Sequence, residues 1–161
     1  MDNIDLGQTS LGGGAEPAEK QASNESLRAA RSVGSQLLGD VVGLLTQSPN
    51  HRHLFLADLE WLIGPPMMLR QFRLFRNQDL PVGVAIWATV SDEIDKELKG
   101  GRTRLKPDEW KSGNNIWLIE LIAPTIIDKP KLVEALLGEL SEHAFGKKAF
   151  KMRARDPKRV S

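Results

Sequence analysis

Apolar residues recur three or four positions apart in the first half of the chain, a spacing typical of helices with one buried face. From Ser26 this pattern predicts a first helix that continues for about twenty residues. Its inward-facing positions are Leu27, Ala30, Gly34, Leu37, Leu38, Val41, Leu44 and Leu45.

A second helix is predicted immediately afterwards. Ser48 followed by Pro49 is a local helix-start signal, because serine caps free amides and proline suits the first helical position. The helix would run to about Trp61 and end at Gly64-Pro65-Pro66.

Strand patterns follow in the second half. Residues 69–76 and 82–90 are strand-like, and the turn-rich segment between them predicts an antiparallel hairpin. A short polar helix is expected over residues 92–98. The apolar run 116–124 then predicts a strand buried on both faces.

Two more elements complete the pattern. A helix capped by Asp128 is expected from about Pro130 to Ala144. The final strand alternates apolar and basic side chains, so its two faces differ. Helices that precede a sheet, itself interrupted by a helix, define an α+β fold in which helices flank the sheet. One face of the last strand would carry Phe150, Met152 and Ala154, and the other face would carry Lys147, Lys151, Arg153 and Arg155.

Composition divides the chain into a tail and one domain. Residues 1–25 hold five acids against one base, include Gly12-Gly13-Gly14 and have few large apolar residues, so we expect a disordered acidic tail. Residues 26–161 are long enough for one globular domain with a core. Apolar runs fall short of the ~20 residues that span a bilayer, and the N-terminus lacks a secretory-signal pattern. A cytoplasmic location without a membrane span is therefore expected.

The residue types present restrict the chemistry. The chain has no cysteine and no tyrosine, so thiolate nucleophiles, thiolate metal sites and a phenolic acid are excluded. Three histidines without clustered carboxylates give little from which to build a metal site. Catalysis would have to use histidine, carboxylates, hydroxyls, lysine or backbone groups.

The C-terminal region is strongly basic although the net charge is only +1. Residues 147–159 carry seven bases against one acid, which favours an acidic partner. Aromatic content is 6%, and Phe150 is expected on the face opposite the bases. Without a stacking surface among the cations, nucleic acid is not the expected partner.

Glu120 stands alone in the apolar run 116–124. A buried carboxylate loses its hydration and needs a cation, a histidine or several hydrogen bonds in return. Two interpretations follow: either Glu120 has such a partner, or it lies at a strand end and reaches solvent.

His51 is the histidine best placed for chemistry. It would lie in the first turn of the helix started by Ser48, where the helix dipole favours a neutral ring. A neutral imidazole near a carboxylate has the parts of a general base. The alternative is a partly exposed helical histidine. His53 would point to another side of the same helix, and His143 is expected on the surface.

Four segments resemble, in order and spacing, the signatures of the RTX toxin-activating lysine acyltransferases. Ser48-Pro49-Asn50-His51-Arg52 resembles the Ser-Pro-x-His-Arg motif of this family. Residues 80–88, 109–113 and 116–124 resemble its Gly-x-Pro-x-Ala-x-x-x-Trp-Ala, Asp-Trp-x-Ser-Gly and Trp-φ-x-Asp-φ-φ-Ala-Pro segments, where φ is apolar. The resemblance covers about residues 37–159.

This resemblance implies a GNAT-like mixed sheet and transfer of a fatty acyl chain to internal lysines of an RTX-type protoxin. The donor would be acyl carrier protein, with no bound cofactor. The essential histidine of the family falls on His51, its assisting serine on Ser48 and its acidic residue on Glu120. Acyl carrier proteins are acidic, so Lys147, Lys151, Arg153 and Arg155 would be docking contacts, joined by Arg70 and Arg73. A homodimer is compatible with this picture.

The chain departs from the family pattern at two positions. Glu120 replaces the usual aspartate, and Arg153 and Arg155 lie on either side of the position of the family arginine before Asp156-Pro157. These departures keep open a second function, a non-catalytic GNAT-like module that docks an acidic protein. A third, an enzyme using acyl-coenzyme A, is disfavoured because no Gln/Arg-x-x-Gly-x-Gly/Ala phosphate loop is visible.

Overall fold

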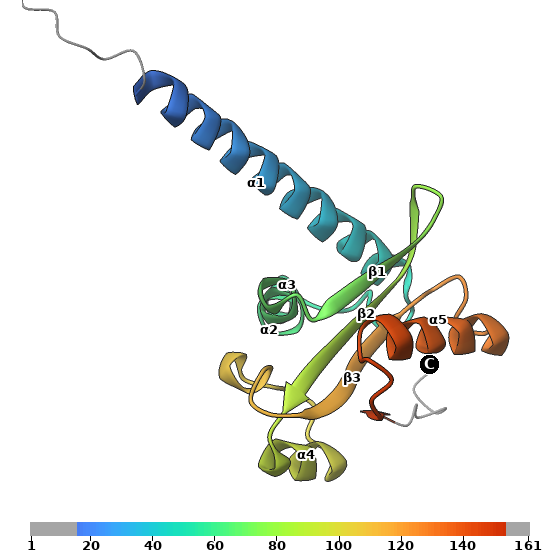
Figure 1. Ribbon diagram of the computed structural model, residues 1–161. Helices are drawn as coiled ribbons and strands as arrows, with labels where there is room; N and C mark the ends of the chain where they lie inside the picture. The colour runs from blue at the N-terminus through green and yellow to red at the C-terminus, as the bar shows by residue number, and fades with distance from the viewer. Residues whose placement is uncertain (1–15, 154–161) are drawn as a thin grey trace, which may run out of the picture. The chain divides into compact units, whose positions relative to one another are not determined.

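The computed structural model describes residues 16–153, which contain five α-helices, one 3-10 helix and four strands (Figure 1). In chain order these are α1 (Glu16–Gln47), α2 (Leu56–Leu62), α3 (Gly64–Leu69), β1 (Phe72–Asn77), β2 (Leu80–Val90), α4 (Asp92–Lys99), η1 (Pro107–Glu109), β3 (Asn115–Ile122), α5 (Pro130–His143) and β4 (Phe150–Met152). The chain divides into two units between Leu38 and Gly39, and the second unit holds the entire sheet. No helix within the described residues is long and apolar enough to cross a membrane.

The strands form one mixed sheet in the order β1-β2-β3-β4. β1 and β2 pair antiparallel as a hairpin, and β3 lies antiparallel to β2. β4 pairs with β3 in parallel through three residue pairs that end at Leu118 and Met152. The predicted fold class, α+β with a GNAT-like mixed sheet flanked by helices, is confirmed.

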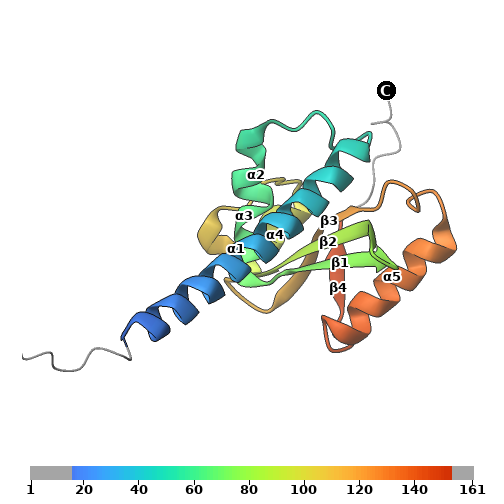
Figure 2. The ribbon, with the colours of Figure 1, turned by 90° about the horizontal axis from the view of Figure 1, so that it is seen from above.

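The two faces of the sheet carry separate hydrophobic clusters. Val84 and Ile86 of β2 and Trp117 of β3 belong to the first cluster, together with residues from the C-terminal end of α1 and from α2. Leu118 of β3 belongs to the second cluster, which packs against Leu140 of α5. We call these sides the α2 face and the α5 face. Figures 1 and 2 show α2 and α3 on one side of the sheet and α5 on the other.

A bulge in β3 decides which face Glu120 occupies. Trp87 pairs with Leu118, whereas its neighbour Ile86 pairs with Glu120, so Ile119 is an extra residue in β3. Successive residues of a regular strand point to opposite faces, and an extra residue breaks this alternation. Glu120 therefore lies opposite Ile86 on the α2 face. Unbroken alternation from Leu118 would have placed it on the α5 face.

The helix expected to start at Ser48 and Pro49 is wrong in its first half. The Ser48 amide donates to the Leu44 carbonyl (3.1 Å), so this serine terminates α1. Residues 49–53 form turns, and α2 starts later, where the Asp58 carboxylate accepts from the Phe55 amide (2.9 Å). Proline disfavours the α conformation for the residue before it, so a Ser-Pro pair can end one helix as well as start another.

Three other boundaries differ from the sequence prediction. Residues 16–25, expected to be disordered, belong to α1, because their Glu, Ala, Lys and Gln residues favour helix. β1 begins after residue 69, since α3 fills that segment and Arg70 adopts a left-handed conformation (φ 56°). Lys147 (φ 60°) precedes β4 in a turn and is not on its basic face. Residues 1–15 and 154–161 lie outside the described residues.

Candidate active site

His51 lies in the turn between α1 and α2. The Ser48 carbonyl accepts hydrogen bonds from the amides of His51 and Arg52, each at 3.0 Å. These bonds fold the Ser-Pro-x-His-Arg segment back on itself and bring Ser48 Oγ to 2.7 Å from His51 Nδ1. Since no helix begins at Ser48, the helix-dipole argument for a neutral His51 was wrong. The buried Ser48 side chain, instead, fixes one edge of the ring.

Glu120 lies at the opposite edge of the same ring. Its Oε2 is 3.2 Å from His51 Nε2, across 69 positions of sequence. The His51 side chain is 12% exposed and that of Glu120 is 32% exposed, so the pair is shielded but still open to solvent. Of the two interpretations of Glu120, the structure shows the one in which this carboxylate has a histidine partner.

The order Ser48, His51, Glu120 determines the proton chemistry of the ring. An ionised carboxylate only accepts hydrogen bonds, so in the neutral ring the hydrogen lies on Nε2, facing Glu120. Nδ1 then accepts a hydrogen bond from the Ser48 hydroxyl and is the basic nitrogen. A hydroxyl, an imidazole and an acid in this order can remove a proton from a group that approaches Ser48.

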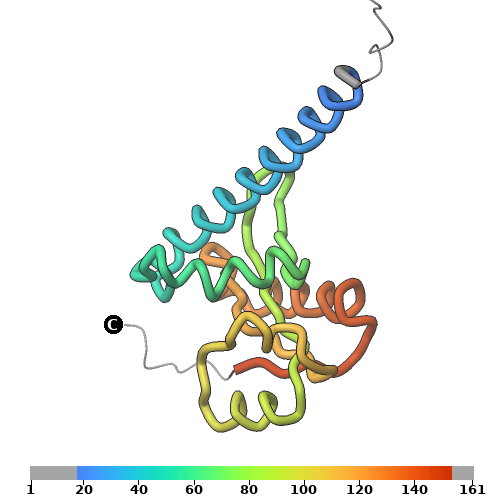
Figure 3. Tube along the Cα trace, turned by 90° about the vertical axis from the view of Figure 1, so that its left-hand side faces the viewer, coloured from blue at the N-terminus to red at the C-terminus, as the bar shows by residue number. Residues whose placement is uncertain are grey.

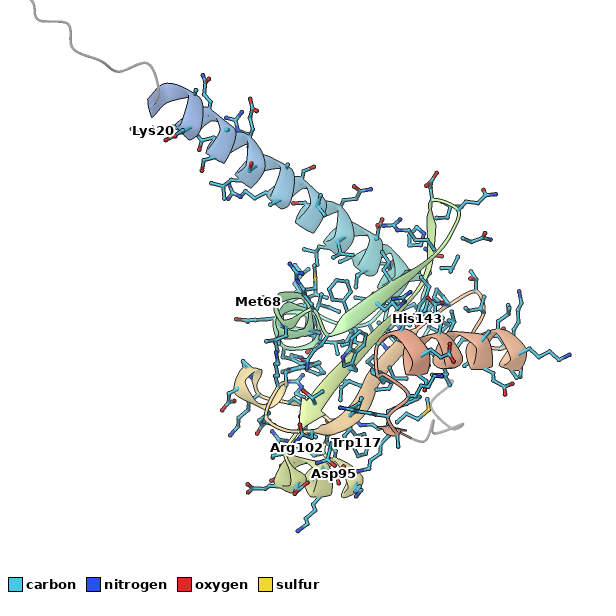
Figure 4. The ribbon with its side chains drawn as sticks, in the orientation of Figure 1. Lys20, Met68, Asp95, Arg102, Trp117 and His143 are labelled. Carbon is cyan, nitrogen blue, oxygen red and sulfur yellow. The ribbon has the colours of Figure 1, made fainter. Side chains whose placement is uncertain are left out.

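The other two histidines lie elsewhere. His53 is exposed, with its Nε2 3.4 Å from the Nε of Arg52. His143, labelled in Figure 4, is the last residue of α5, and it is exposed. The sequence prediction that His53 cannot share the His51 site is thus consistent with the structure, although turns and not a helix separate them.

The bases proposed to dock an acidic carrier have different environments. Lys151 Nζ lies 2.5 Å from Asp95 Oδ1, and Arg153 Nη2 donates to the carbonyls of Arg102 and Thr103, each at 2.9 Å. Both are therefore engaged within the domain. The other predicted bases have less extensive contacts: Lys147 is exposed with its Nζ 3.8 Å from Glu142, Arg73 pairs with Glu139, and Arg70 is exposed. Arg155 lies outside the described residues.

A buried carboxylate on α4 was not singled out by the sequence analysis. Asp95 accepts from Trp117 Nε1 (2.8 Å) and pairs with Lys151 and with Lys99 (2.7 Å), which joins α4 to β3 and β4 (Figure 4). Burial raises the pKa of Asp95, but the hydrogen bonds from Lys151, Lys99 and Trp117 outweigh it and hold the pKa well below its usual range. An available signal was an acid between Ile94 and Leu98 on the apolar side of an amphipathic helix.

Arg153 directly follows β4 and interacts with one residue of the candidate site. Its guanidinium is bonded to the segment that follows α4, and Figure 3 shows these two parts of the chain next to each other. Burial lowers the pKa of Arg153, while the negative charge of Glu120 opposes this shift. Arg153 therefore interacts electrostatically with the acid that contacts His51.

The segment 109–113, one of the four family-like motifs, has a structural role. Trp110 is completely buried, and Ser112 Oγ accepts from the Ser91 amide (3.0 Å) at the start of α4. A side chain on Gly113 would come within 2.6 Å of the Ser91 backbone, so only glycine fits there without movement. This motif anchors the turn that leads into β3.

The profile of the RTX toxin acyltransferase family matches residues 31–160. This match covers most of the chain, and it agrees with a mixed sheet that carries a Ser-His-Glu arrangement. The chain belongs to the RTX toxin acyltransferase family, so the resemblance drawn from the four motifs is confirmed.

Individual relatives agree with this assignment. The lysine-acyltransferase RtxC of Vibrio cholerae serotype O1 is 38% identical over 92 residues, which are 55% of this chain and 59% of that protein. The leukotoxin-activating lysine-acyltransferase LktC of a Pasteurella haemolytica-like species is 32% identical over 88 residues, 55% of this chain and 53% of its own. The protein-lysine palmitoyltransferase CyaC of Bordetella bronchiseptica is 28% identical over 123 residues, 76% of this chain and 66% of its own. The chain thus spans little more than half the length of the first two proteins.

Proposed function

We propose that this protein is a protein-lysine acyltransferase that moves a fatty acyl chain from acyl carrier protein to lysines of an RTX-type protoxin. The observation that carries the proposal is His51, held between Ser48 Oγ at 2.7 Å and Glu120 Oε2 at 3.2 Å. Further support comes from the family and from relatives named as lysine acyltransferases. The acyl donor is a co-substrate, and no bound cofactor is required.

His51 acts as the general base. A lysine ammonium has a pKa of about 10.4 in water, so it first releases one proton to solvent, and the neutral amine that results can attack a thioester. The amine nitrogen then bonds to the thioester carbon and the carbon–sulfur bond breaks. The amine proton passes to His51, which returns it to the departing thiolate as a thiol. Glu120 orients the ring and stabilises the imidazolium, and backbone amides hold the transient oxyanion.

Ser48 lies between the basic nitrogen and any group that approaches from its side. Its hydroxyl can accept the lysine proton while it donates its own to Nδ1, so that the acyl chain is transferred directly in a ternary complex. The same geometry also suits an activated serine, which would form a seryl ester that lysine then attacks. The direct scheme needs fewer steps and is the one we adopt.

Docking of an acidic carrier needs cations that are free of internal partners. Lys151 and Arg153 are engaged within the domain, so we assign them a smaller part in docking than the sequence suggested. Lys147 is exposed and only weakly associated with Glu142, and it remains a candidate contact. Such surface charges chiefly accelerate and orient the encounter.

The test is mass spectrometry of a lysine-bearing RTX protein co-expressed with this chain and an acyl carrier protein. We expect a lysine mass increase equal to one fatty acyl chain, and its loss with His51→Ala. His53→Ala is the matched control, because it removes an exposed histidine two residues away. Acylation that survives His51→Ala in a folded protein would contradict the base assignment. A target that binds but is never modified by wild type would favour the non-catalytic module.

A further inference from the structure

Arg153 and Glu120 lie on the same face of the sheet. Trp117 and Lys151 are partners in the β3–β4 register, and both contact Asp95 Oδ1, which places them together on the α2 face. Arg153 directly follows β4 and lines one pocket together with Trp117, so it lies on that face. The bulge at Ile119 brings Glu120 to the same side.

The guanidinium of Arg153 is held in place by its hydrogen bonds. Its Nη2 donates to two successive carbonyls, those of Arg102 and Thr103, at 2.9 Å each. Carbonyl oxygens accept hydrogen bonds without neutralising the cation. The positive charge of Arg153 therefore remains available to Glu120, whose negative charge favours the charged form of this arginine.

We propose that Arg153 is a positioning residue, whose fixed cation attracts the Glu120 carboxylate and keeps it directed at His51. The inference rests on the proposed function, because it describes the supply of an oriented base partner. In the described part of the chain, the charged or titratable groups found to interact with Glu120 are His51, from the α1–α2 turn, and Arg153, at the end of β4. Glu120 lies between an imidazole that receives a proton and a permanent cation.

The position of Arg153 predicts that its replacement changes the pH dependence of kcat/KM. A cation beside the pair favours the carboxylate and disfavours the imidazolium, so its removal makes both groups hold protons at higher pH. Arg153→Gln should therefore move the acidic limb of kcat/KM against pH upward by about one pH unit. Arg153→Lys keeps the charge and should leave the limb near its wild-type position. A role limited to tethering residues 102 and 103 would lower kcat without moving the limb.

Lys151→Gln is the matched control. It removes a cation from the same face, two residues before Arg153, and the partner of this cation is Asp95. We expect it to leave the acidic limb where it is in wild type. An unmoved limb in Arg153→Gln, or an equal movement in Lys151→Gln, would overturn the proposal. If Arg153→Gln unfolds below the assay temperature, Arg153→Met, which keeps the aliphatic stem, is measured in its place.

A second readout needs no turnover. The side-chain carboxyl carbon of Glu120, followed by NMR in the free protein, should titrate at higher pH in Arg153→Gln than in wild type. Identical titrations would overturn the proposal even if the enzyme assay gave no product. Absence of acylation by wild type would instead count against the proposed function, so the two failures are distinguishable.

Discussion

Glu120 Oε2 lies 3.2 Å from His51 Nε2, and this contact depends on one extra residue in a strand. Ile119 interrupts the alternation of β3 and turns Glu120 from the α5 face to the α2 face, where the α1–α2 turn presents His51. A local irregularity of the sheet thus brings together two groups that are 69 positions apart. Bulges are known to redirect side chains next to functional sites in this way.

Replacement of the carboxylate tests this contact directly. Glu120→Gln keeps the size of the side chain but removes the negative charge that stabilises the imidazolium, so kcat/KM for acyl transfer should fall about 100-fold. Glu120→Asp keeps the charge on a side chain one methylene shorter, and we expect a smaller loss of about tenfold. Initial rates with saturating acyl donor measure both. Equal activity of all three proteins would show that the carboxylate serves only the structure.

Ser48→Ala separates the two schemes for the serine. A hydroxyl that relays a proton can be replaced by water, so direct transfer predicts a loss of about 10- to 100-fold with residual activity. A seryl ester predicts complete loss. Rapid-quench mass spectrometry of wild type with acyl donor alone should find no acylated Ser48. Thr46→Ala, which deletes a nearby hydroxyl bonded to the Gly43 carbonyl (2.8 Å), is the control and should act like wild type.

Two glycines should respond oppositely to alanine. In Gly113→Ala the new methyl would lie 2.5 Å from the Val90 carbonyl oxygen, so we expect a loss of about 1–3 kcal/mol in the free energy of unfolding. Gly138, in α5, has open space around it, and Gly138→Ala should add about 0.5–1 kcal/mol. Urea unfolding followed by circular dichroism measures both. A neutral Gly113→Ala would show that the turn can move.

Asp95 should make stability depend on acid pH. Its pKa is lower in the folded protein than in the unfolded chain, so its contribution is present above the ordinary aspartate value of about 3.9. As pH falls below that value, the contribution is lost. Asp95→Asn should lower the free energy of unfolding at pH 7 by about 1–3 kcal/mol and flatten the decline of this free energy below about pH 4.

Glu93→Gln, which neutralises an exposed acid on the same helix, is the control for the dependence of the free energy of unfolding on pH. This substitution should leave the decline of the free energy of unfolding at acid pH nearly unchanged. The role of Asp95 as the buried link between α4 and the sheet would be contradicted if the free energy of unfolding of wild type did not change below about pH 4. It would also be contradicted if Asp95→Asn left this pH dependence unaltered.

The sequence by itself determined the hairpin, the strand around Glu120, the short helix 92–98 and the helix that begins at Pro130, because their apolar periods act locally. The predicted cap of that last helix was wrong, since Lys129 and not Asp128 is the N-cap residue of α5. It also indicated His51, Ser48 and Glu120 through their motifs. The sequence did not determine where α1 ends, because the Ser48-Pro49 pair suits both the end and the start of a helix.

Only the tertiary structure decided which face Glu120 takes, because a bulge arises from the pairing of β3 with β2 and leaves no period in the sequence. Only the tertiary structure also showed the partners of Lys151 and Arg153, which the sequence pattern had placed on an unpaired basic face. Their partners, Asp95 and the carbonyls of residues 102 and 103, come from a segment about fifty positions earlier. Hydrogen bonds between such distant segments are fixed by packing and not by local sequence.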